Sequence, residues 1–153
     1  MPITFTNTIY DDVIDSLATI IIFDDIIETL ATIINDEFTI PIHYDEHRGN
    51  QSFLLTPESD TLLEHLSSGI SREYSISVEY QVKSGGTYNK NSFKQVSNIM
   101  ERFKRLVFNN INYSSGTSWF DGRITDIDYS RDEDDGTLLK GVATFVCNNI
   151  EII

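Results

Sequence analysis

The alternation of apolar and polar residues between Tyr74 and Val82 restricts the fold of this chain more than any other feature. Tyr74, Ile76, Val78, Tyr80 and Val82 alternate with polar residues, and a period of two places all five on one face of a β-strand. A strand buried on one face only is typical of antiparallel or mixed sheets. We therefore expect other strands beside this one and helices over its apolar face.

The segment from Ile9 to Asp36 predicts a helical region near the N-terminus. It contains neither Gly nor Pro, and its apolar residues recur at intervals of three and four. Asp11 or Asp12 can cap its start, whereas Asp25 and Glu28 form a second capping pattern. One continuous helix and two helices that meet after Phe23 therefore remain alternatives.

A second amphipathic helix is predicted to begin at Asn91 or Ser92 and to end near Asn109 and Asn110. Its apolar face consists of Phe93, Val96, Ile99, Met100, Phe103 and Val107.

The remaining apolar segments predict two hairpins. In the first, residues 40–44 and 53–55 flank a turn at Arg48-Gly49-Asn50; in the second, residues 119–129 and 138–150 flank Asp135-Gly136. The segment 56–72 is rich in Ser, with Pro57 and Gly69, so we expect a long loop with one helical turn, mobile in the free subunit and ordered in an assembly.

Together these elements predict one α+β domain over residues 1–153, with residues 1–8 as an N-terminal arm. Its sheet is mixed or antiparallel with about five strands, and two or three helices lie on one face.

The chain is acidic, with 24 Asp and Glu against 11 Lys and Arg and a formal net charge of −13. This charge repels nucleic-acid phosphates and argues against a binder of duplex DNA. No apolar run approaches the ~18 residues of a membrane span, so we expect a soluble protein without a membrane partner. The single Cys147 excludes an internal disulfide.

The charge is also unevenly distributed. Residues 1–47 contain no Lys or Arg and ten acids: Asp11, Asp12, Asp15, Asp24, Asp25, Glu28, Asp36, Glu37, Asp45 and Glu46. Residues 90–105 contain one acid, Glu101, and five basic residues: Lys90, Lys94, Arg102, Lys104 and Arg105. We expect the two helical regions to lie close together, either within one subunit or between neighbouring subunits, where such pairs fix the register of association.

His43, Asp45 and His47 alternate along an extended segment, so their nitrogen and oxygen atoms are weak candidates for binding a divalent ion. On this interpretation the alternative function is a small metal-dependent hydrolase. The segment also enters a turn at Gly49, where polar residues are expected in any protein. We expect no bound metal and no cofactor.

Other acidic residues offer two further candidates, one catalytic and one for binding calcium. Asp126 and Asp128 share a strand face, and the run Asp132–Asp135 lacks the spacing of a calcium loop and fits a solvated hairpin tip. No nucleophile elbow or phosphate-binding loop accompanies them in the sequence. We expect no catalytic residues and no enzyme.

Trp119 and Phe120 are adjacent, so a strand places them on opposite faces. Either the sheet is covered on both sides, or one ring packs in a subunit interface, where aromatic residues are enriched.

Three segments in this order of elements carry a resemblance to a known family. They are Ile40-Pro41-Ile42-His43-Tyr44-Asp45-Glu46, Tyr74-Ser75-Ile76-Ser77-Val78-Glu79-Tyr80 and Trp119-Phe120-Asp121-Gly122-Arg123-Ile124. The chain resembles the tail terminator, or tail completion, proteins of tailed bacteriophages, which are related to neck and head–tail joining proteins. Its N-terminal helical region is longer than the first helix expected in that family.

This resemblance implies a structural virion protein. It would form a homo-oligomeric ring, expected to be a hexamer, that caps the tail tube protein and offers a face to the neck or connector protein. Genomic DNA would pass through the lumen without specific binding, and the chain would be found in the host cytoplasm during assembly. The alternative within this region of the virion is another neck or head–tail joining protein. Our interface candidates are Trp119, Phe120, Arg102, Arg105, Asp24, Asp25, Glu64 and Arg72.

Overall fold

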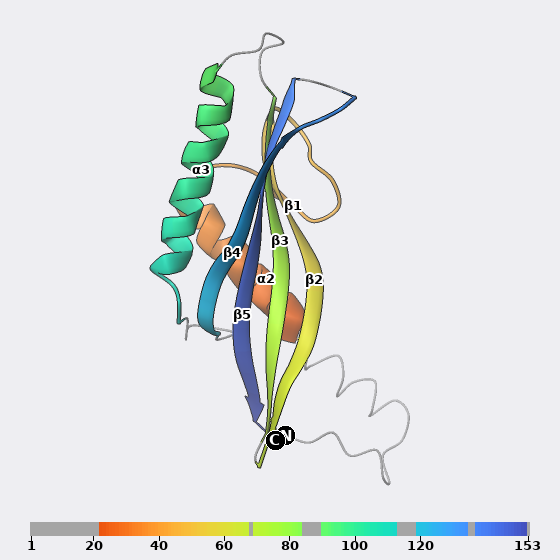
Figure 1. Ribbon diagram of the computed structural model, residues 1–153, viewed down its shortest axis with the longest axis vertical. Coiled ribbons are helices and arrows are strands. Elements are labelled where there is room, and N and C mark those ends of the chain that lie inside the picture. Colours follow the sequence, from red (N-terminus) through yellow and green to blue (C-terminus); the bar gives the residue numbers. More distant parts are fainter. Residues whose placement is uncertain (1–21, 68, 84–89, 113–118, 135–136, 153) are drawn as a thin grey trace.

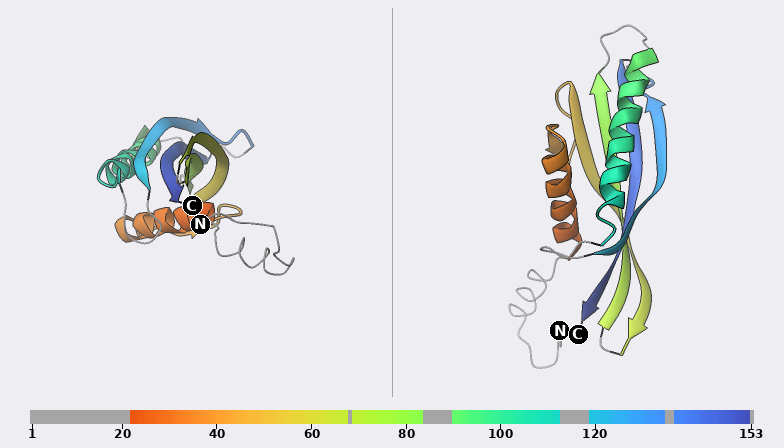
Figure 2. Two further views of the ribbon diagram at one scale, coloured as in Figure 1. Left: turned by 90° about the horizontal axis from the view of Figure 1, so that it is seen from below. Right: turned by 90° about the vertical axis from the view of Figure 1, so that its left-hand side faces the viewer.

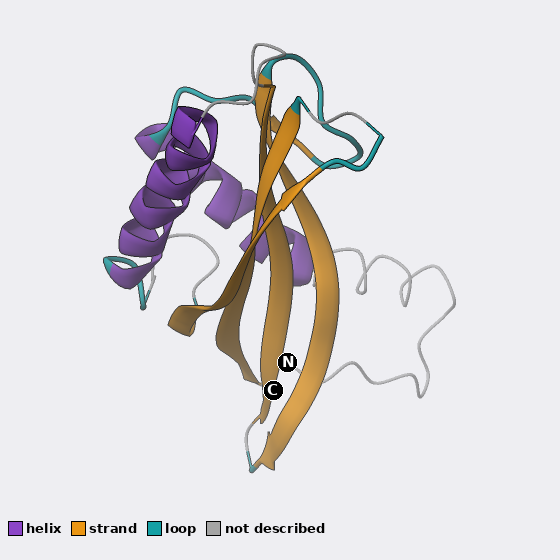
Figure 3. Ribbon diagram, turned by 45° about the horizontal axis from the view of Figure 1, so that its top comes forward, coloured by secondary structure: helices purple, strands orange, loops and turns teal. Residues whose placement is uncertain are grey.

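The computed structural model describes residues 22–67, 69–83, 90–112, 119–134 and 137–152 of the chain (Figure 1). These residues form one five-stranded sheet with the strand order β1-β2-β3-β5-β4, and two helices. The elements are α2 (Ile22–Glu37), β1 (Ile42–His43), β2 (Gln51–Leu66), β3 (Gly69–Lys83), α3 (Lys90–Phe108), β4 (Phe120–Arg131) and β5 (Leu138–Ile152). Both helices lie on the same side of the sheet (Figure 3). The predicted α+β class and mixed sheet are confirmed.

Helix α2 forms because its apolar residues share one face. Ile26, Leu30 and Ile34 are fully buried, and Asp24 and Asp25 lie in the first turn, where negative charge favours the positive end of the helix dipole. The expected helical segment 9–21, its cap at Asp11 or Asp12 and the arm 1–8 lie outside the described residues.

Helix α3 has the predicted apolar face, and its start precedes the predicted cap by one or two residues. Val96, Met100 and Phe103 are completely buried. Asn110 closes the helix, since its side-chain Nδ2 donates to the carbonyl oxygen of Leu106 at 2.8 Å. The predicted closing residue is therefore correct.

The core lies between the two helices and one face of the sheet. As the alternation predicted, Tyr74, Ile76, Val78, Tyr80 and Val82 of β3 are all buried. The ring of Phe53 lies 5.3 Å from those of both Phe38 and Tyr80. These contacts join the end of α2 to the two neighbouring strands β2 and β3.

Helix α3 approaches β5 most closely at Gly141. A Cβ atom at this position would lie 2.8 Å from Cγ of Met100 and 2.9 Å from Cγ1 of Val96. Such distances are shorter than van der Waals contact, so a glycine is required for the helix to sit at this height above the sheet.

The predicted first hairpin is wrong in its strand direction. β1 pairs with β2 in parallel, with Ile42 opposite Phe53 and His43 opposite Leu54. Residues 44–50 carry the chain back to the level at which β1 began, so that β2 starts in the same direction (Figure 1). A periodicity of two predicts a strand but does not specify the direction of its partner.

The predicted loop at 56–72 is also wrong. Residues 56–66 continue β2 and pair with β3 in antiparallel register, from Thr56 opposite Ser77 to Leu66 opposite Gly69. The register shifts at Pro57/Ser59 and Leu62/Glu64; such irregularities accommodate proline in an edge strand. Paired strands therefore stand where a mobile loop with one helical turn was expected.

The second hairpin is confirmed. β4 and β5 pair in antiparallel register from Phe120 opposite Asn148 to Arg131 opposite Leu139. The turn residues Asp135 and Gly136, and the segments 84–89 and 113–118, lie outside the described residues.

Candidate functional site

The sheet extends beyond the two helices as a narrow projection made from β2, β3 and β5, which is plain in the right-hand view of Figure 2. We call residues 58–66, 69–73 and 148–152 the β-extension. All described side chains of β2 from Thr56 to Leu66 are exposed although their backbone is paired with β3. Leu62, Leu63 and Leu66 are among the exposed large apolar residues. Because these leucines are exposed to water, the β-extension is a candidate contact surface.

Both edges of the β-extension are open within the described part of the chain. β1 reaches only Phe53 and Leu54 of β2, and the pairing of β4 with β5 ends at Asn148. Strand edges with unpaired N–H and C=O groups are sites for pairing with another chain. Two polar contacts brace the β2–β3 hairpin: Arg72 Nε lies 2.6 Å from Asp60 Oδ1, and Ser75 Oγ donates to Glu58 Oε2 at 3.0 Å.

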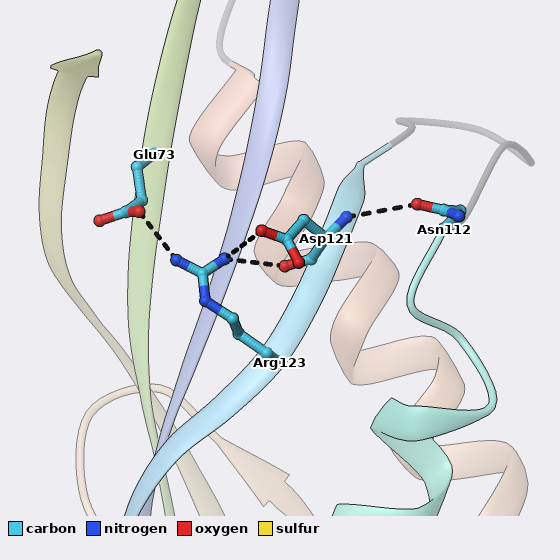
Figure 4. A network of polar contacts seen from close by, with 4 residues as sticks. All are labelled: Glu73, Asn112, Asp121 and Arg123. Atoms are coloured by element: carbon cyan, nitrogen blue, oxygen red, sulfur yellow. Dashed lines mark hydrogen bonds and ion pairs between the residues drawn. The ribbon is translucent and has the colours of Figure 1, made fainter.

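A polar network lies at the base of the β-extension, on the sheet face opposite the helices (Figure 4). Arg123 Nη2 lies 2.9 Å from Glu73 Oε2, and its Nη1 donates to Oδ2 and to the backbone oxygen of Asp121 at 3.1 and 2.9 Å. The Asp121 N–H donates to Asn112 Oδ1 at 3.3 Å. The network therefore ties β4 to β3 and to the segment after α3.

Asp121 adopts φ = 54°, the left-handed conformation that non-glycine residues rarely occupy. It sits in the register shift between Phe120 and Arg123. The next residue, Gly122, has no room for a side chain, because a Cβ there would lie 2.8 Å from Nε1 of Trp119. The strained left-handed conformation of Asp121 thus occurs where the backbone passes close to the indole ring of Trp119.

The adjacent rings of Trp119 and Phe120 face opposite sides, as expected. Trp119 is buried and its ring meets that of Phe145 edge-on at 5.4 Å, while its Nε1 donates to the backbone oxygen of Asn110 at 2.9 Å. Phe120 is exposed. Within the residues that the structure describes, the sheet is therefore not covered on both sides at this point.

A groove of about 250 Å³ lies between the end of α3 and the start of β4. Among the residues that line it, Phe108 is 72% exposed, the highest value among the described large apolar side chains. The groove is lined by Lys104, Val107, Phe108, Ile111, Asp121, Gly122, Arg123 and Ile124. We call it the α3–β4 groove; it combines apolar walls with charged rims.

The two oppositely charged helical regions meet within one chain. Arg102 Nη2 lies 3.1 Å from Glu37 Oε1 and 3.2 Å from the backbone oxygen of Glu37, and its guanidinium covers the ring of Phe38 at 4.6 Å. Arg105, Asp24 and Asp25 are exposed. Because both partners of the pair are half exposed, it contributes only ~0–1 kcal/mol.

The structure does not assemble His43, Asp45 and His47 into one site. His47 Nδ1 lies 2.6 Å from Ser52 Oγ, and Nε2 lies 2.9 Å from Glu79 Oε2. Asp45 instead pairs with Arg48 at 2.8 Å. Among the residues described here, no group of three His, Cys, Asp or Glu side chains is placed to hold a metal ion.

The hydrogen bond with His47 is the largest cause that holds the pKa of Glu79 below its ordinary value. Ionised Glu79 therefore stabilises the fold above its unfolded-state pKa, near 4.5, and this contribution is lost as the pH falls through the lower folded-state pKa. We expect Glu79→Gln to be less stable than the wild type at pH 7, with the difference shrinking as the pH falls below the unfolded-state pKa of Glu79. Urea unfolding at several pH values measures it.

Asp128→Asn is the control for this measurement, because Asp128 is an exposed carboxylate on β4. Its difference from the wild type should stay small across the same pH range. A Glu79→Gln difference that does not change between pH 7 and pH 3 would contradict the assigned role of Glu79.

The other candidate chemical groups are dispersed. Asp126 and Asp128 are both exposed on β4, and Asp132 Oδ1 accepts from the Asp134 N–H at 2.8 Å, a local contact within the predicted hairpin tip. Burial raises the pKa of the Cys147 thiol to about 12, so this thiol is a core group without nucleophilic character at neutral pH.

Sequence reasoning missed the Arg123 network and the exposed Phe108. The partners Glu73 and Arg123 are 50 residues apart, and no local pattern relates them. Phe108 did carry a signal, since it directly follows Val107, the last residue of the apolar face, and so falls on a different side of the helix.

A comparison with models of known protein families finds no match, and a comparison with curated proteins finds none either. Neither of the described helices is long and apolar enough to cross a membrane.

Proposed function

We propose that this chain is a structural virion protein that assembles into a hexameric ring at the end of a bacteriophage tail tube and contacts the neck. The observation that carries the proposal is the β-extension, with its exposed leucines and open strand edges. A projection of this kind buries its apolar surface only in an assembly. Trp119, Phe120, Arg102, Arg105, Asp24, Asp25, Glu64 and Arg72 were the sequence-based interface candidates; of these, Glu64, Arg72 and Phe120 lie on or beside the β-extension.

Two further observations support this proposal. The strand at Tyr74–Tyr80, helix α3 and the hairpin after Trp119 follow one another in the order on which the resemblance to tail terminator proteins rests, although paired strand stands where a long loop was expected before Tyr74. The sheet carries its helices on one face, which leaves the other face for neighbouring subunits. The net charge of −13 suits a ring whose lumen lets DNA pass without adhesion.

The resemblance also covers neck proteins. The proposal of a ring that caps the tail tube makes a more specific prediction about particles that lack this chain. Phage particles assembled without this chain should have tail tubes of uncontrolled length and heads that are not joined to tails, because the tube end has neither cap nor docking face. Negative-stain electron microscopy measures both defects. Tails of normal length that are joined to heads would contradict the proposal.

A matched control uses the wild-type chain supplied in trans to the same particles. Supplied chain should restore the tube length and should appear, when it carries a gold-binding tag, at the head-proximal end of the tube. Label along the whole tube, or on the head alone, would also contradict the proposed position.

A further inference from the structure

Two exposed apolar clusters of this chain lie on different elements and differ in the charges around them. The first is on the β-extension, where Leu63 is 47% exposed. It has no register partner, because the pairing shifts between Leu62 and Glu64, and such a bulge turns a side chain away from the regular strand faces. Leu63 therefore presents an exposed apolar side chain on a strand edge that is open in the described part of the chain.

The second cluster is concave. The α3–β4 groove has apolar walls of Val107, Phe108 and Ile111, and Phe108 is far more exposed than is usual for a large aromatic residue. A concave apolar groove of this size can bind a small number of apolar side chains from another chain.

The charges at the two clusters are complementary. On β2, Glu64 is exposed beside Leu63, and in the described part of the chain it takes part in no salt bridge. The groove carries Lys104 on its rim; Lys104 Nζ lies 2.8 Å from Glu101 Oε1, and both side chains of this pair are half exposed. The described side chains of α3 comprise four basic groups, Lys94, Arg102, Lys104 and Arg105, against the single acid Glu101, so the helix keeps a net positive charge. Opposite charges that flank matched apolar surfaces steer association and fix its register.

One chain cannot join its own two clusters. The β-extension projects away from the end of α3 as part of the same continuous sheet (Figure 2), so a second copy must supply one side of the contact. A contact between two different surfaces is head-to-tail, and its repetition builds closed rings when the rotation between copies closes.

We infer that Leu63, at the register shift of the β-extension in one copy, docks into the α3–β4 groove of the next copy. Leu63 enters between Phe108 and Ile111, and Glu64 faces Lys104. The inference rests on the proposed ring and names the two surfaces that build it.

The test uses two full-length chains with different tags, one with Leu63→Cys and one with Phe108→Cys. Cys147 is completely buried, so a short bis-maleimide reagent reacts only at the introduced thiols. In a 1:1 mixture the mixed cross-link should exceed each homodimer by roughly tenfold or more, because a formed contact holds the two thiols at an effective concentration of order mM. Denaturing gel electrophoresis with tag detection counts the three products.

The control replaces the groove thiol by Asp128→Cys, an exposed position on β4, which should give no excess of mixed product with Leu63→Cys. An excess equal to that of Phe108→Cys would overturn the inference. So would a predominance of Leu63→Cys homodimers, which would indicate that the β-extensions pair with each other, and so would the absence of any cross-linked product.

A charge exchange tests the same contact without cross-linking. Glu64→Lys and Lys104→Glu should each weaken association of the chain in sedimentation experiments, and the double variant should recover most of it at low salt. A double variant no better than the single variants would overturn the pairing of these two residues.

The outcomes separate this contact from the proposed function. Wild-type rings in native mass spectrometry without a Leu63–Phe108 cross-link overturn the contact and leave the ring. Tails of normal length joined to heads, in particles that lack the chain, overturn the proposed function whatever the cross-linking result.

Discussion

Replacing Phe53 by Ala is expected to lower the free energy of unfolding by about 3–5 kcal/mol. Phe53 is completely buried and lies between the rings of Phe38 and Tyr80, so the substitution leaves a cavity where α2, β2 and β3 meet. Because a whole domain is stable by only ~5–15 kcal/mol, this loss removes a large part of the total. Urea unfolding followed by circular dichroism measures it.

Tyr129→Ala is the matched control, since it also truncates an aromatic ring but at an exposed position on β4. Its effect should stay within ~0.5 kcal/mol, as is usual for surface substitutions. Losses of similar size for the two variants would show that the core is not centred on Phe53.

Replacing Gly141 by Val is expected to destabilise the protein by about 1–3 kcal/mol through overpacking. Val has the higher strand propensity, but that scale spans only ~1 kcal/mol, whereas the new side chain would press on Met100 and Val96 of α3. The steric effect therefore exceeds the gain in propensity. Thermal unfolding of the single variant gives the sign.

A double variant tests the cause. Met100→Ala alone should cost about 2–5 kcal/mol, and it also removes atoms that the valine side chain introduced by Gly141→Val would meet. The loss in Gly141→Val/Met100→Ala should therefore be smaller than the sum of the losses in the two single variants, by ~0.5–3 kcal/mol. Strictly additive losses would contradict a clash between these two positions.

The strongly periodic elements could be predicted from the sequence because one of their faces is buried. Tyr74–Val82 and the apolar face of α3 repeat with the period of their secondary structure, and the structure buries these side chains. The meeting of the two helical regions was also predictable, since unlike charges are concentrated in them, although the specific pair Arg102–Glu37 was not.

The β-extension could not be predicted in the same way. Its residues on β2 are exposed on both faces, so burial imposes no alternation, and Pro57 and Gly69 resemble loop residues. Only the pairing with β3 makes this segment a strand, and pairing is a property of two segments. The parallel direction of β1 and the contact of His47 with Glu79, 32 residues away, also depend on two separate segments and so could not be predicted from a local pattern.

The position of β5 in the sheet has a consequence for biosynthesis. β5 lies between β3 and β4, yet it follows both of them along the chain, so the ribosome delivers this interior strand after its two neighbours. Until Leu138–Ile152 has emerged, the nascent chain holds α2, the β2–β3 hairpin and α3 with an open edge on β3, and β4 has no strand to join. A translation product that stops before Leu138 would therefore be a chain with an open sheet edge prone to aggregation, and not a smaller folded domain.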